Sequence, residues 1–463
     1  MPRVKADAEG EGARKIVVIG LGTGGLYASR AASRVDRKAE ITIIERRSYD
    51  MFSPCGLPYA IEGVVGGFDD LKHTVPTTRR LRKLLGHEAL SIDVEGKRVE
   101  VKNLESGEVS WVDYDSLIIA TGSRPAVLPI PGAEELLGRG VHVVSNPENA
   151  RDLRDAALRS RRAVVVGGGA IGLEIAVALK RLGLEVWVTK RTPPPFPRNL
   201  DPDMGRIITD HLRSLGLNIL FGKGIDRING GERVESVEIA GETIPADLVV
   251  MAVGGRPESK IAVEAGIATE RGAIVTDERM ETNVEDVYAI GDVASTFSGV
   301  DGSPAKINLA TAAYRQAAIA GVNAAGGDAV FDGALGTFVS FIGGLEVAST
   351  GYNTSTAESH GYRVATGRAN MKTKPGWMPG AKNISVKLIV DAETGRLIGG
   401  QAVGEEGAAW RVNVVALAIK RRMTVQEFST IELAYCPPVS DLYDPLLVAA
   451  DAAVRRLSKR PPR

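Results

Sequence analysis

The arrangement of apolar and polar residues repeats the same order of elements at two places in the chain. Residues 15–20 (KIVVIG) form an apolar run, which leads into the Gly-rich stretch GLGTGGLYASRAAS and then into EITIIE at 40–45. This order predicts a strand, a tight turn, a helix and a second strand. About 147 residues later it returns, at 163–183 (AVVVGGGAIGLEIAVALKRLG) and 185–191 (EVWVTKR). The chain therefore has two predicted βαβ units of the kind that binds dinucleotides.

The pattern after each unit predicts how these folds close. Matching strand-and-turn phrases at 117–125 (LIIATGSRP) and 248–257 (LVVMAVGGRP) would each close one nucleotide fold, and the apolar strand within 282–294 ends in Gly291-Asp292. Beyond about residue 330 the pattern changes to the strands TFVSFIG, ISVKLIVD and LIGGQAVG and the helical run GAAWRVNVVALAIKRRM. This change predicts a third domain of the α+β class.

These elements predict an α/β protein with two Rossmann-like dinucleotide-binding domains and a C-terminal α+β domain. The expected parts are a disordered tail at 1–14, a first nucleotide domain at 15–143 and 271–328, a second at 144–270, and the C-terminal domain at 332–456, for which the resemblance described below implies a role as dimer interface.

The composition of the chain limits its possible binding partners and the cellular compartment in which it works. Lys plus Arg and Asp plus Glu both number 57 among 463 residues, without a long block of one sign, so we expect neither nucleic acid nor membrane as a partner. The polar start has no apolar core and does not resemble a signal peptide. Two cysteines, 55 and 436, form neither a disulfide framework nor a CxxC zinc motif. We therefore expect a cytoplasmic protein without a metal site.

The first Gly-rich turn has the spacing that a bound pyrophosphate requires. Gly20 would make the tight turn, Gly22 would let the backbone approach the phosphates, and Gly25 would let helix and strand pack closely. Glu45 follows at the end of the next strand, where a carboxylate can accept hydrogen bonds from a ribose. A structural turn in any α/β protein is the alternative, but strand, helix and carboxylate together favour a nucleotide site.

The second turn, formed by Gly167, Gly169 and Gly172, has the same context and a different strand end. Lys190 stands where Glu45 stands in the first unit, and Arg191 follows it. Two cations would attract the 2'-phosphate of NADPH, which a carboxylate repels. The alternative is that both cations only solvate a loop.

Cys55 lies in SYDMFSPCGLPYAIEG, a Pro- and Gly-rich turn that leads into a predicted helix. A single cysteine is often a small buried apolar residue. Here a helix N-terminus and a bound flavin would both favour the reactive thiolate. We therefore expect Cys55 to be the nucleophile and electron relay.

The chain resembles the single-cysteine branch of the pyridine nucleotide-disulfide oxidoreductases, which contains coenzyme A-disulfide reductases, NADH oxidases, NADH peroxidases and persulfide or polysulfide reductases. The resemblance extends from Lys15 to about Ala450 and rests on both Gly-rich units and on the phrases PCGLPY, ATG, AIGD and AYCPPVSDLYDP. It implies a homodimer whose last domain forms the interface.

The resemblance also implies roles for individual residues. FAD would be bound by Gly20, Gly22, Gly25, Glu45, Arg46, Ala120, Thr121, Gly122, Gly291 and Asp292. NADPH or NADH would be bound by Gly167, Gly169, Gly172, Glu174, Lys190 and Arg191. Coenzyme A or a related substrate would be bound by Arg30, Arg34, Phe52 and Ser53. For Glu174 and the two arginines, an ordinary first-turn acid and a solvated helix face are the alternatives.

Departures from the family pattern favour a sulfur substrate. Position 60, where dithiol members have a second cysteine, is Ala60. Thr23 stands where oxidase and peroxidase members have a histidine in the first turn. We therefore expect coenzyme A disulfide, a persulfide or a polysulfide as the substrate. The alternatives are an NAD(P)H oxidase that reduces dioxygen and a non-enzymatic flavin-bearing sensor or electron-transfer protein.

The C-terminal phrase adds a second candidate catalytic residue. Tyr435, in the family's Y-x-P-P phrase, would reach the partner's Cys55 and donate a proton to a departing thiolate. A second family tyrosine is replaced by Trp377, in Trp-Met-Pro-Gly. Cys436 is expected to be a packed core thiol, with a supplementary redox thiol as the alternative.

Overall fold

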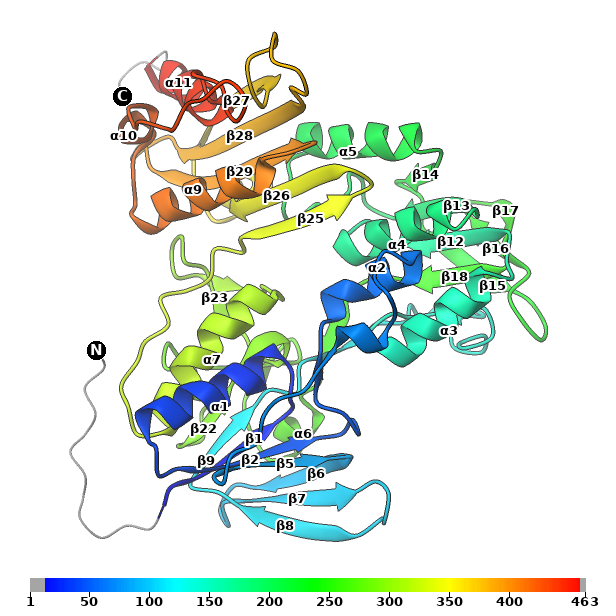
Figure 1. The fold of residues 1–463 in the computed structure, drawn as a ribbon, viewed down its shortest axis with the longest axis vertical. Helices are drawn as coiled ribbons and strands as arrows, with labels where there is room; N and C mark the ends of the chain where they lie inside the picture. Colours follow the sequence, from blue (N-terminus) through cyan, green and yellow to red (C-terminus); the bar gives the residue numbers. More distant parts are fainter. Residues whose placement is uncertain (1–12, 459–463) are drawn as a thin grey trace.

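The computed structural model describes residues 13–458, arranged in three lobes (Figure 1). Each lobe is built on a five-stranded sheet. Most of the expected disordered tail, residues 1–14, lies outside the described residues. Arg14, at its end, donates hydrogen bonds to Ser116 and to Asp286 Oδ1, both at 2.9 Å.

The first lobe has a parallel sheet of order β22-β9-β1-β2-β5. Its strands are β22 (Val287–Ala289), β9 (Ser116–Ile119), β1 (Lys15–Ile19), β2 (Glu40–Glu45) and β5 (Leu81–Leu85). Helices α1 (Thr23–Val35) and α7 (Ala310–Ala324) pack together, and apolar side chains from both join those of the sheet in one core. A three-stranded sheet formed by β6 (His87–Asp93), β7 (Arg98–Asn103) and β8 (Val109–Asp113) extends this lobe. Because β22 comes from residues 287–289, the chain leaves this lobe and returns to it.

The second lobe repeats the parallel architecture in the order β11-β18-β12-β13-β14. Its strands are β11 (Val141–His142), β18 (Leu248–Met251), β12 (Arg162–Val166), β13 (Glu185–Lys190) and β14 (Asn218–Phe221). Helices α3 (Pro147–Ala157), α4 (Ala170–Arg181) and α5 (Pro202–Ser214) belong to this lobe, and apolar side chains of all three join one buried cluster.

The first two lobes are joined by a short two-stranded ribbon. Strand β10 (Ser123–Pro125), which follows β9, pairs antiparallel with β19 (Gly255–Pro257), which follows β18. Both segments leave their own sheet directly after a strand that is second from the sheet's edge. Their register places Arg124 opposite Arg256.

The third lobe is an antiparallel sheet of order β25-β26-β29-β28-β27. Its strands are β25 (Phe338–Ile342), β26 (Leu345–Gly351), β29 (Leu397–Gly404), β28 (Asn383–Asp391) and β27 (Val364–Lys372). Helix α9 (Ala408–Lys420) packs on β26 and β29, and α11 (Pro445–Ser458) packs on β27 and β28. The predicted fold class, with two Rossmann-like domains and a C-terminal α+β domain, is confirmed.

The three lobes meet at the start of one short helix. The turn η1 (Pro54–Gly56) and α2 (Leu57–Glu62) come from the first lobe and pack on α3 and α4 of the second. Strand β25 of the third lobe also contacts α4. Lys387 on β28 binds Asp201 and Asp203, at the start of α5, at 2.7 and 2.9 Å. This junction holds the predicted reactive cysteine.

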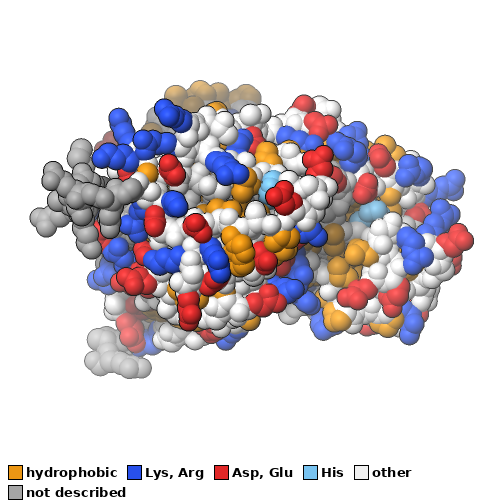
Figure 2. Space-filling view, turned by 90° about the horizontal axis from the view of Figure 1, so that it is seen from below, with side chains coloured by type: hydrophobic (Ala, Val, Ile, Leu, Met, Phe, Trp, Pro, Cys, Tyr) orange, Lys and Arg blue, Asp and Glu red, His pale blue; other side chains and the backbone are white. Residues whose placement is uncertain are grey.

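The molecular surface agrees with the balanced composition. Seen from below, Lys and Arg side chains are interspersed with Asp and Glu over the visible face (Figure 2). Among the described residues, the structure has no helix long and apolar enough to cross a bilayer.

Candidate active site

The first Gly-rich turn fits closely against its own fold. Gly20 has a left-handed φ of +102°, and a Cβ there would lie 2.4 Å from the carbonyl oxygen of Ala120. A Cβ at Gly25 would lie 1.9 Å from the oxygen of Gly20. At Gly22 a Cβ would meet nothing within 4 Å. Two of these glycines therefore allow close packing, and Gly22 leaves open space beside the turn.

Glu45 is held at this turn by a partner that the sequence did not reveal. Its carboxylate accepts hydrogen bonds from the backbone N–H of Leu21, at 2.7 Å, and from the guanidinium of Arg47, at 2.8 and 2.9 Å. Burial raises the pKa of Glu45, but the hydrogen bonds and charge of Arg47 outweigh burial, so the pKa lies below its ordinary value. Glu45 therefore stays ionised and fixed. Arg46, which we had assigned to the cofactor, is exposed and pairs with Glu88 at 3.5 Å.

The ATG and GD phrases meet beside the same turn. The hydroxyl of Thr121 donates to the carbonyl of Glu258 at 2.7 Å, and Ser123 donates to Asp292 at 3.0 Å. The N–H of Gly291 donates to the side chain of Gln316 at 2.8 Å. These bonds fix Asp292 at the carboxyl end of the sheet, where a cofactor of an open α/β sheet binds.

The second Gly-rich turn repeats the first in its packing. Gly167 has φ +135°, and a Cβ there would lie 2.1 Å from the carbonyl oxygen of Ala252. A Cβ at Gly172 would lie 2.6 Å from the oxygen of Gly167, and one at Gly169 would meet nothing within 4 Å. The three glycines thus have the same division of roles as in the first lobe.

Lys190 lies across this second turn. Its Cδ would be 2.8 Å from a Cβ at Gly168, and its ammonium donates to the carbonyl of Thr192. Partial burial lowers its pKa. Arg191 is exposed and lies beside Gly224. One cation therefore covers the turn, and the other points into solvent at its rim.

Cys55 is exposed at the start of α2, within the turn η1. The N–H of Gly56 donates to the carbonyl of Ser53 at 3.0 Å, which fixes the turn. Partial desolvation of the thiol and then the charge of Glu174 raise the pKa of Cys55. Among the groups of the protein, desolvation and the nearby carboxylate thus disfavour the thiolate that the sequence predicts at this helix N-terminus.

The residues before Cys55 have partners of their own. The hydroxyl of Ser53 lies 2.7 Å from Nε2 of His73, and the ring of Phe52 lies 5.1 Å from the guanidinium carbon of Arg47. Ser53 and Phe52 are therefore each in contact with a residue from another segment. His73, which comes from a separate strand, could not be linked to Ser53 by any sequence pattern.

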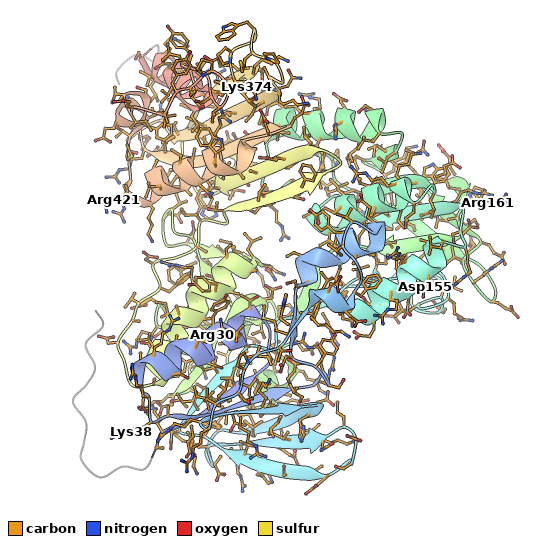
Figure 3. The ribbon with its side chains drawn as sticks, viewed as in Figure 1. Arg30, Lys38, Asp155, Arg161, Lys374 and Arg421 are labelled. Carbon is orange, nitrogen blue, oxygen red and sulfur yellow. The ribbon has the colours of Figure 1, made fainter. Side chains whose placement is uncertain are left out.

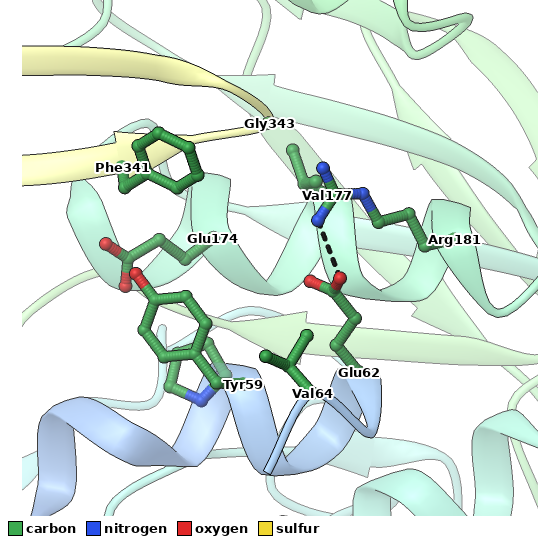
Figure 4. A pocket seen from close by; sticks show the side chains of 9 residues that line it. Tyr59, Glu62, Val64, Glu174, Val177, Arg181, Phe341 and Gly343 are labelled. Carbon is green, nitrogen blue, oxygen red and sulfur yellow. Dashed lines mark hydrogen bonds and ion pairs between the residues drawn. The ribbon is translucent and has the colours of Figure 1, made fainter. Parts of the chain in front are cut away.

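Glu174 lies in a cavity between α2, α4 and β25 (Figure 4). The hydroxyl of Ser340 donates to its carboxylate at 2.6 Å, and burial raises its pKa. At the other end of the cavity, Arg181 binds Glu62 at 2.6 Å. The lining residues are Pro58, Tyr59, Glu62, Val64, Glu174, Val177, Arg181, Phe341 and Gly343.

Two family models match almost the whole chain. The model described as pyridine nucleotide-disulphide oxidoreductase matches residues 14–317, and that of the dimerisation domain of the same proteins matches 339–445. The chain belongs to the pyridine nucleotide-disulphide oxidoreductases. The predicted family, the enzyme class and the pair of cofactors, FAD and NAD(P)H, are confirmed.

Similar proteins of this family match over nearly their full length or a large part of it. An NADH oxidase of Methanocaldococcus jannaschii is 35% identical over 96% of this chain and 100% of its own. An NAD(P)H sulfur oxidoreductase (CoA-dependent) of Pyrococcus abyssi is 34% identical over 94% of this chain and 97% of its own. The structure of an NAD-dependent persulfide reductase from A. fulgidus superposes with a TM-score of 0.91, at 34% identity over 96% of this chain and 83% of that one.

The residues at the first turn of this oxidoreductase fit an FAD. Gly22 leaves room for a pyrophosphate, the helix α1 begins directly after it, and Glu45 offers an ionised carboxylate at the strand end. Asp292 lies at the same sheet edge, oriented by Ser123. Gly169 and Lys190 offer the corresponding space and a cation at the second turn.

The arginines assigned to a substrate lie on α1 of this oxidoreductase. The guanidinium carbon of Arg30 lies 5.5 Å from the ring centre of Tyr27, whose ring contacts that of Tyr314 edge-on at 4.6 Å. Arg30 is thus an exposed residue of α1 (Figure 3), and Arg34 lies one turn further along the helix. Tyr27 and Tyr314 were not found from the sequence.

Tyr435 lies in the dimerisation domain, between α10 (Val425–Ser429) and α11. Helix α11 packs at the β27 edge of the sheet, whereas α4 contacts the opposite edge, β25. Cys436 is exposed in the part of the chain that the structure describes, in the irregular connection between α10 and α11, so the expected packed core thiol is wrong. The exposed large apolar residues in the two connections that precede β28 and α11 are Trp377, Tyr435, Val439, Leu442 and Tyr443.

Proposed function

We propose that this chain uses NAD(P)H and FAD to reduce coenzyme A disulfide, a persulfide or a polysulfide through Cys55. The observation that carries the proposal is an exposed thiol at the start of α2 with a fully buried alanine, Ala60, at the position of a second cysteine. Cys55 therefore has no internal disulfide partner on this helix. A sulfur that bonds to it has to come from a substrate.

Each part of the site has a defined task in this reaction. Gly20, Gly22, Glu45 and Asp292 would hold FAD, which supplies two-electron chemistry between the pyridine nucleotide and sulfur. Cys55 attacks one sulfur of the substrate, forms a mixed disulfide and releases the other sulfur as a thiolate.

The names of similar proteins support a sulfur substrate. The relative from Pyrococcus abyssi is named for sulfur reduction that depends on CoA, and the A. fulgidus protein for persulfide reduction. Thr23, at the first position of α1, is not the histidine that the oxidase pattern predicts. We further propose NADPH as an effective donor, because Lys190 lies over the second turn.

We propose that the working form is a cytoplasmic homodimer. Five exposed apolar residues in the connections before β28 and α11 of the dimerisation domain would be covered by a second copy, because large exposed apolar patches are uncommon on monomers. In that dimer Tyr435 would face the partner's Cys55 and donate a proton to the departing thiolate. Two unpaired cysteines favour a reducing compartment.

A second candidate function is NAD(P)H oxidation by dioxygen. It is favoured by the 35% identity to the oxidase of Methanocaldococcus jannaschii. In this reaction Cys55 would cycle through a sulfenic acid rather than a mixed disulfide. The two functions differ in the substrate that accepts the electrons and can therefore be measured side by side.

The substitution Cys55→Ser tests whether Cys55 passes electrons from the flavin to a sulfur substrate. We expect the variant to keep NAD(P)H-driven flavin reduction and to lose turnover of coenzyme A disulfide and polysulfide, because the nucleophile is gone. Flavin absorbance measures the first step, and release of free thiol or sulfide measures the second. Cys436→Ser is the matched control and should keep both. Full disulfide turnover by Cys55→Ser would contradict the proposal.

A further inference from the structure

The segment 192–201 lies between the second Gly-rich turn and the third lobe. It runs from the end of β13 to the start of α5 and consists of bends and turns. Its first residue, Thr192, accepts a hydrogen bond from the ammonium of Lys190. Figure 1 shows α5, which follows the segment, beside the third sheet, and α5 contacts β29 there. One connection thus touches both the proposed NAD(P)H site and the dimerisation domain.

Phe196 joins this segment to the Gly-rich turn. Its N–H donates to the carbonyl oxygen of Gly168 at 3.0 Å, in the middle of the turn at 167–169. Phe196 has a left-handed φ of +52°, a conformation that residues other than glycine seldom adopt. Such a backbone persists only where its surroundings impose it. The contact with Gly168 therefore depends on the residues that fix Phe196.

Two residues of the third lobe fix Phe196 and the residues after it. The side chain of Phe196 is 3% exposed, and its ring centre lies 5.7 Å from that of Phe338, the first residue of β25. The amide of Asn353, itself 2% exposed, donates to the carbonyl oxygens of Pro197 at 2.9 Å and Leu200 at 3.4 Å. A buried ring contact and a buried amide thus hold the middle of the segment.

The last residue of the segment, Asp201, is bound to the same lobe. Its carboxylate accepts hydrogen bonds from the N–H and the hydroxyl of Thr354, at 2.8 and 2.6 Å, and binds Lys387 at 2.7 Å. The N–H of Asp201 donates to the side chain of Gln401 at 2.9 Å. The third lobe therefore holds the segment at its end as well as in its middle.

We propose that the third lobe positions the NAD(P)H site through the segment 192–201, with Phe196 and Asn353 as positioning residues. The inference rests on the proposed role of the second Gly-rich turn as the NAD(P)H site. While the segment is bound to the third lobe, it supports the carbonyl of Gly168 and the ammonium of Lys190. When it leaves that lobe both supports are lost, so the apparent affinity falls with the fraction of molecules in which the segment is bound.

The proposal concerns binding of the coenzyme and not the transfer of its hydride. A Gly-rich turn and the cation at the next strand end recognise the phosphates of a dinucleotide. A looser segment would therefore weaken phosphate binding and leave the reaction of bound NADPH unchanged. The expected signature is a higher dissociation constant with an unchanged limiting rate of flavin reduction.

Asn353→Ala tests this role in the FAD-loaded protein. Loss of the amide should raise the dissociation constant of NADP⁺ about fivefold, the effect of one buried hydrogen bond, as measured by calorimetric titration. Amide hydrogen exchange in the segment 192–201 should become faster by about the same factor. The limiting rate of flavin reduction at saturating NADPH should not change. A parent-like dissociation constant would overturn the proposal, whatever the exchange rate.

The matched control loses a helix cap in the same lobe. Asn353 also caps α8 (Thr354–Ser359), by accepting from the N–H of Thr356 at 2.9 Å. Thr424→Ala removes the corresponding cap of α10, where Thr424 accepts from the N–H of Glu427 at 3.2 Å and α10 packs on α11. It should leave NADP⁺ binding unchanged. An equal loss of affinity in Thr424→Ala would mean general destabilisation of the lobe and would overturn the proposal.

Phe338→Leu is the second variant, for the case that Asn353→Ala does not fold. It removes the ring contact with Phe196 and keeps an apolar side chain at the start of β25. It should raise the dissociation constant of NADP⁺ about two- to tenfold, the usual range for an aromatic pair. An unchanged dissociation constant in this variant would also overturn the proposal.

Hydrogen exchange in the parent protein separates this inference from the proposed function. NADP⁺ should slow exchange in the turn at 167–169. If it does not, the placement of NAD(P)H is wrong, and this inference fails with it. If it does, and Asn353→Ala binds NADP⁺ like the parent, only the role of the third lobe fails. A parent enzyme that reduces no disulfide would contradict the sulfur substrate and leave these binding results as they are.

Discussion

The two Gly-rich turns have the same backbone design and opposite charges at the end of the next strand. In both, the first glycine packs on an alanine carbonyl, Ala120 or Ala252, and the middle glycine leaves open space. The strand β2 ends in Glu45, whereas β13 ends in Lys190. We therefore propose that the turn sets the space for a dinucleotide and that one side chain at the strand end sets the choice of dinucleotide.

Steric contacts at the turns should give the largest effect. Gly25→Ala places a Cβ 1.9 Å from a backbone oxygen, so we expect loss of bound FAD and of the folded first lobe. Gly172→Ala, with a contact of 2.6 Å, should keep FAD and weaken NAD(P)H binding. Flavin absorbance and thermal unfolding measure both. Gly67→Ala, where a Cβ meets nothing within 4 Å, is the control. A Gly25→Ala protein that is still yellow with bound FAD and has an unchanged Tm would contradict this role of the first turn.

Removal of Arg47, the cation that binds Glu45, should have the next largest effect, on the unfolding free energy. Arg47→Met leaves a mostly buried carboxylate without its partner, which costs about 2 kcal/mol of unfolding free energy at pH 7. The lowered pKa of Glu45 gives stability that is present above the unfolded pKa, about 4.3, and is lost as pH falls through the folded value. The difference from the parent should therefore shrink below about pH 4.

The exposed neighbour supplies the control for that measurement. Arg46→Met removes a surface ion pair with Glu88 and should change the unfolding free energy by less than about 0.5 kcal/mol. Equal losses for the two arginines, or a loss in Arg47→Met that does not depend on pH, would count against the assigned role of Arg47.

The choice between the two pyridine nucleotides should show the smallest effect. Lys190→Glu gives the second unit the acid of the first, and loss of one charge-assisted contact of about 1.5 to 3 kcal/mol should raise the NADH-to-NADPH ratio of kcat/KM about ten- to hundredfold. Arg191→Ala, an exposed side chain, should change the ratio less than about fivefold. An unchanged ratio in Lys190→Glu would mean that the cation only solvates its loop.

The sequence predicted the parts of the site that depend on local order. The turns around Gly20 and Gly167 and the strand end at Lys190 follow from neighbouring residues, and the fold class follows from their repetition. The partners that orient the site come from distant segments. Ser340 reaches Glu174 across 166 positions, and no periodicity predicts such a contact.

The lack of long-range information in a sequence pattern also explains two further differences between the expected and the observed site. Arg46 and Arg47 both follow Glu45 directly in the sequence, and the sequence alone did not show which of them binds it. In the structure Arg47 binds Glu45, and Arg46 pairs with Glu88. The exposure of Cys436 depends on an irregular connection after α10, for which the chain has no repeating pattern. Short-range sequence patterns thus predict helices and strands better than they predict which residues pack against them.

The ribbon of β10 and β19 pairs equivalent segments of the first two lobes and links the movement of one lobe to that of the other. Its register, with Arg124 opposite Arg256, relates the Arg-Pro ends of the two strand-and-turn phrases by a local twofold axis. A duplicated ancestral unit would meet its own copy in this way, at the point where each copy leaves its sheet. Both backbone crossings between the first two lobes pass through this ribbon, so twisting one crossing twists the other.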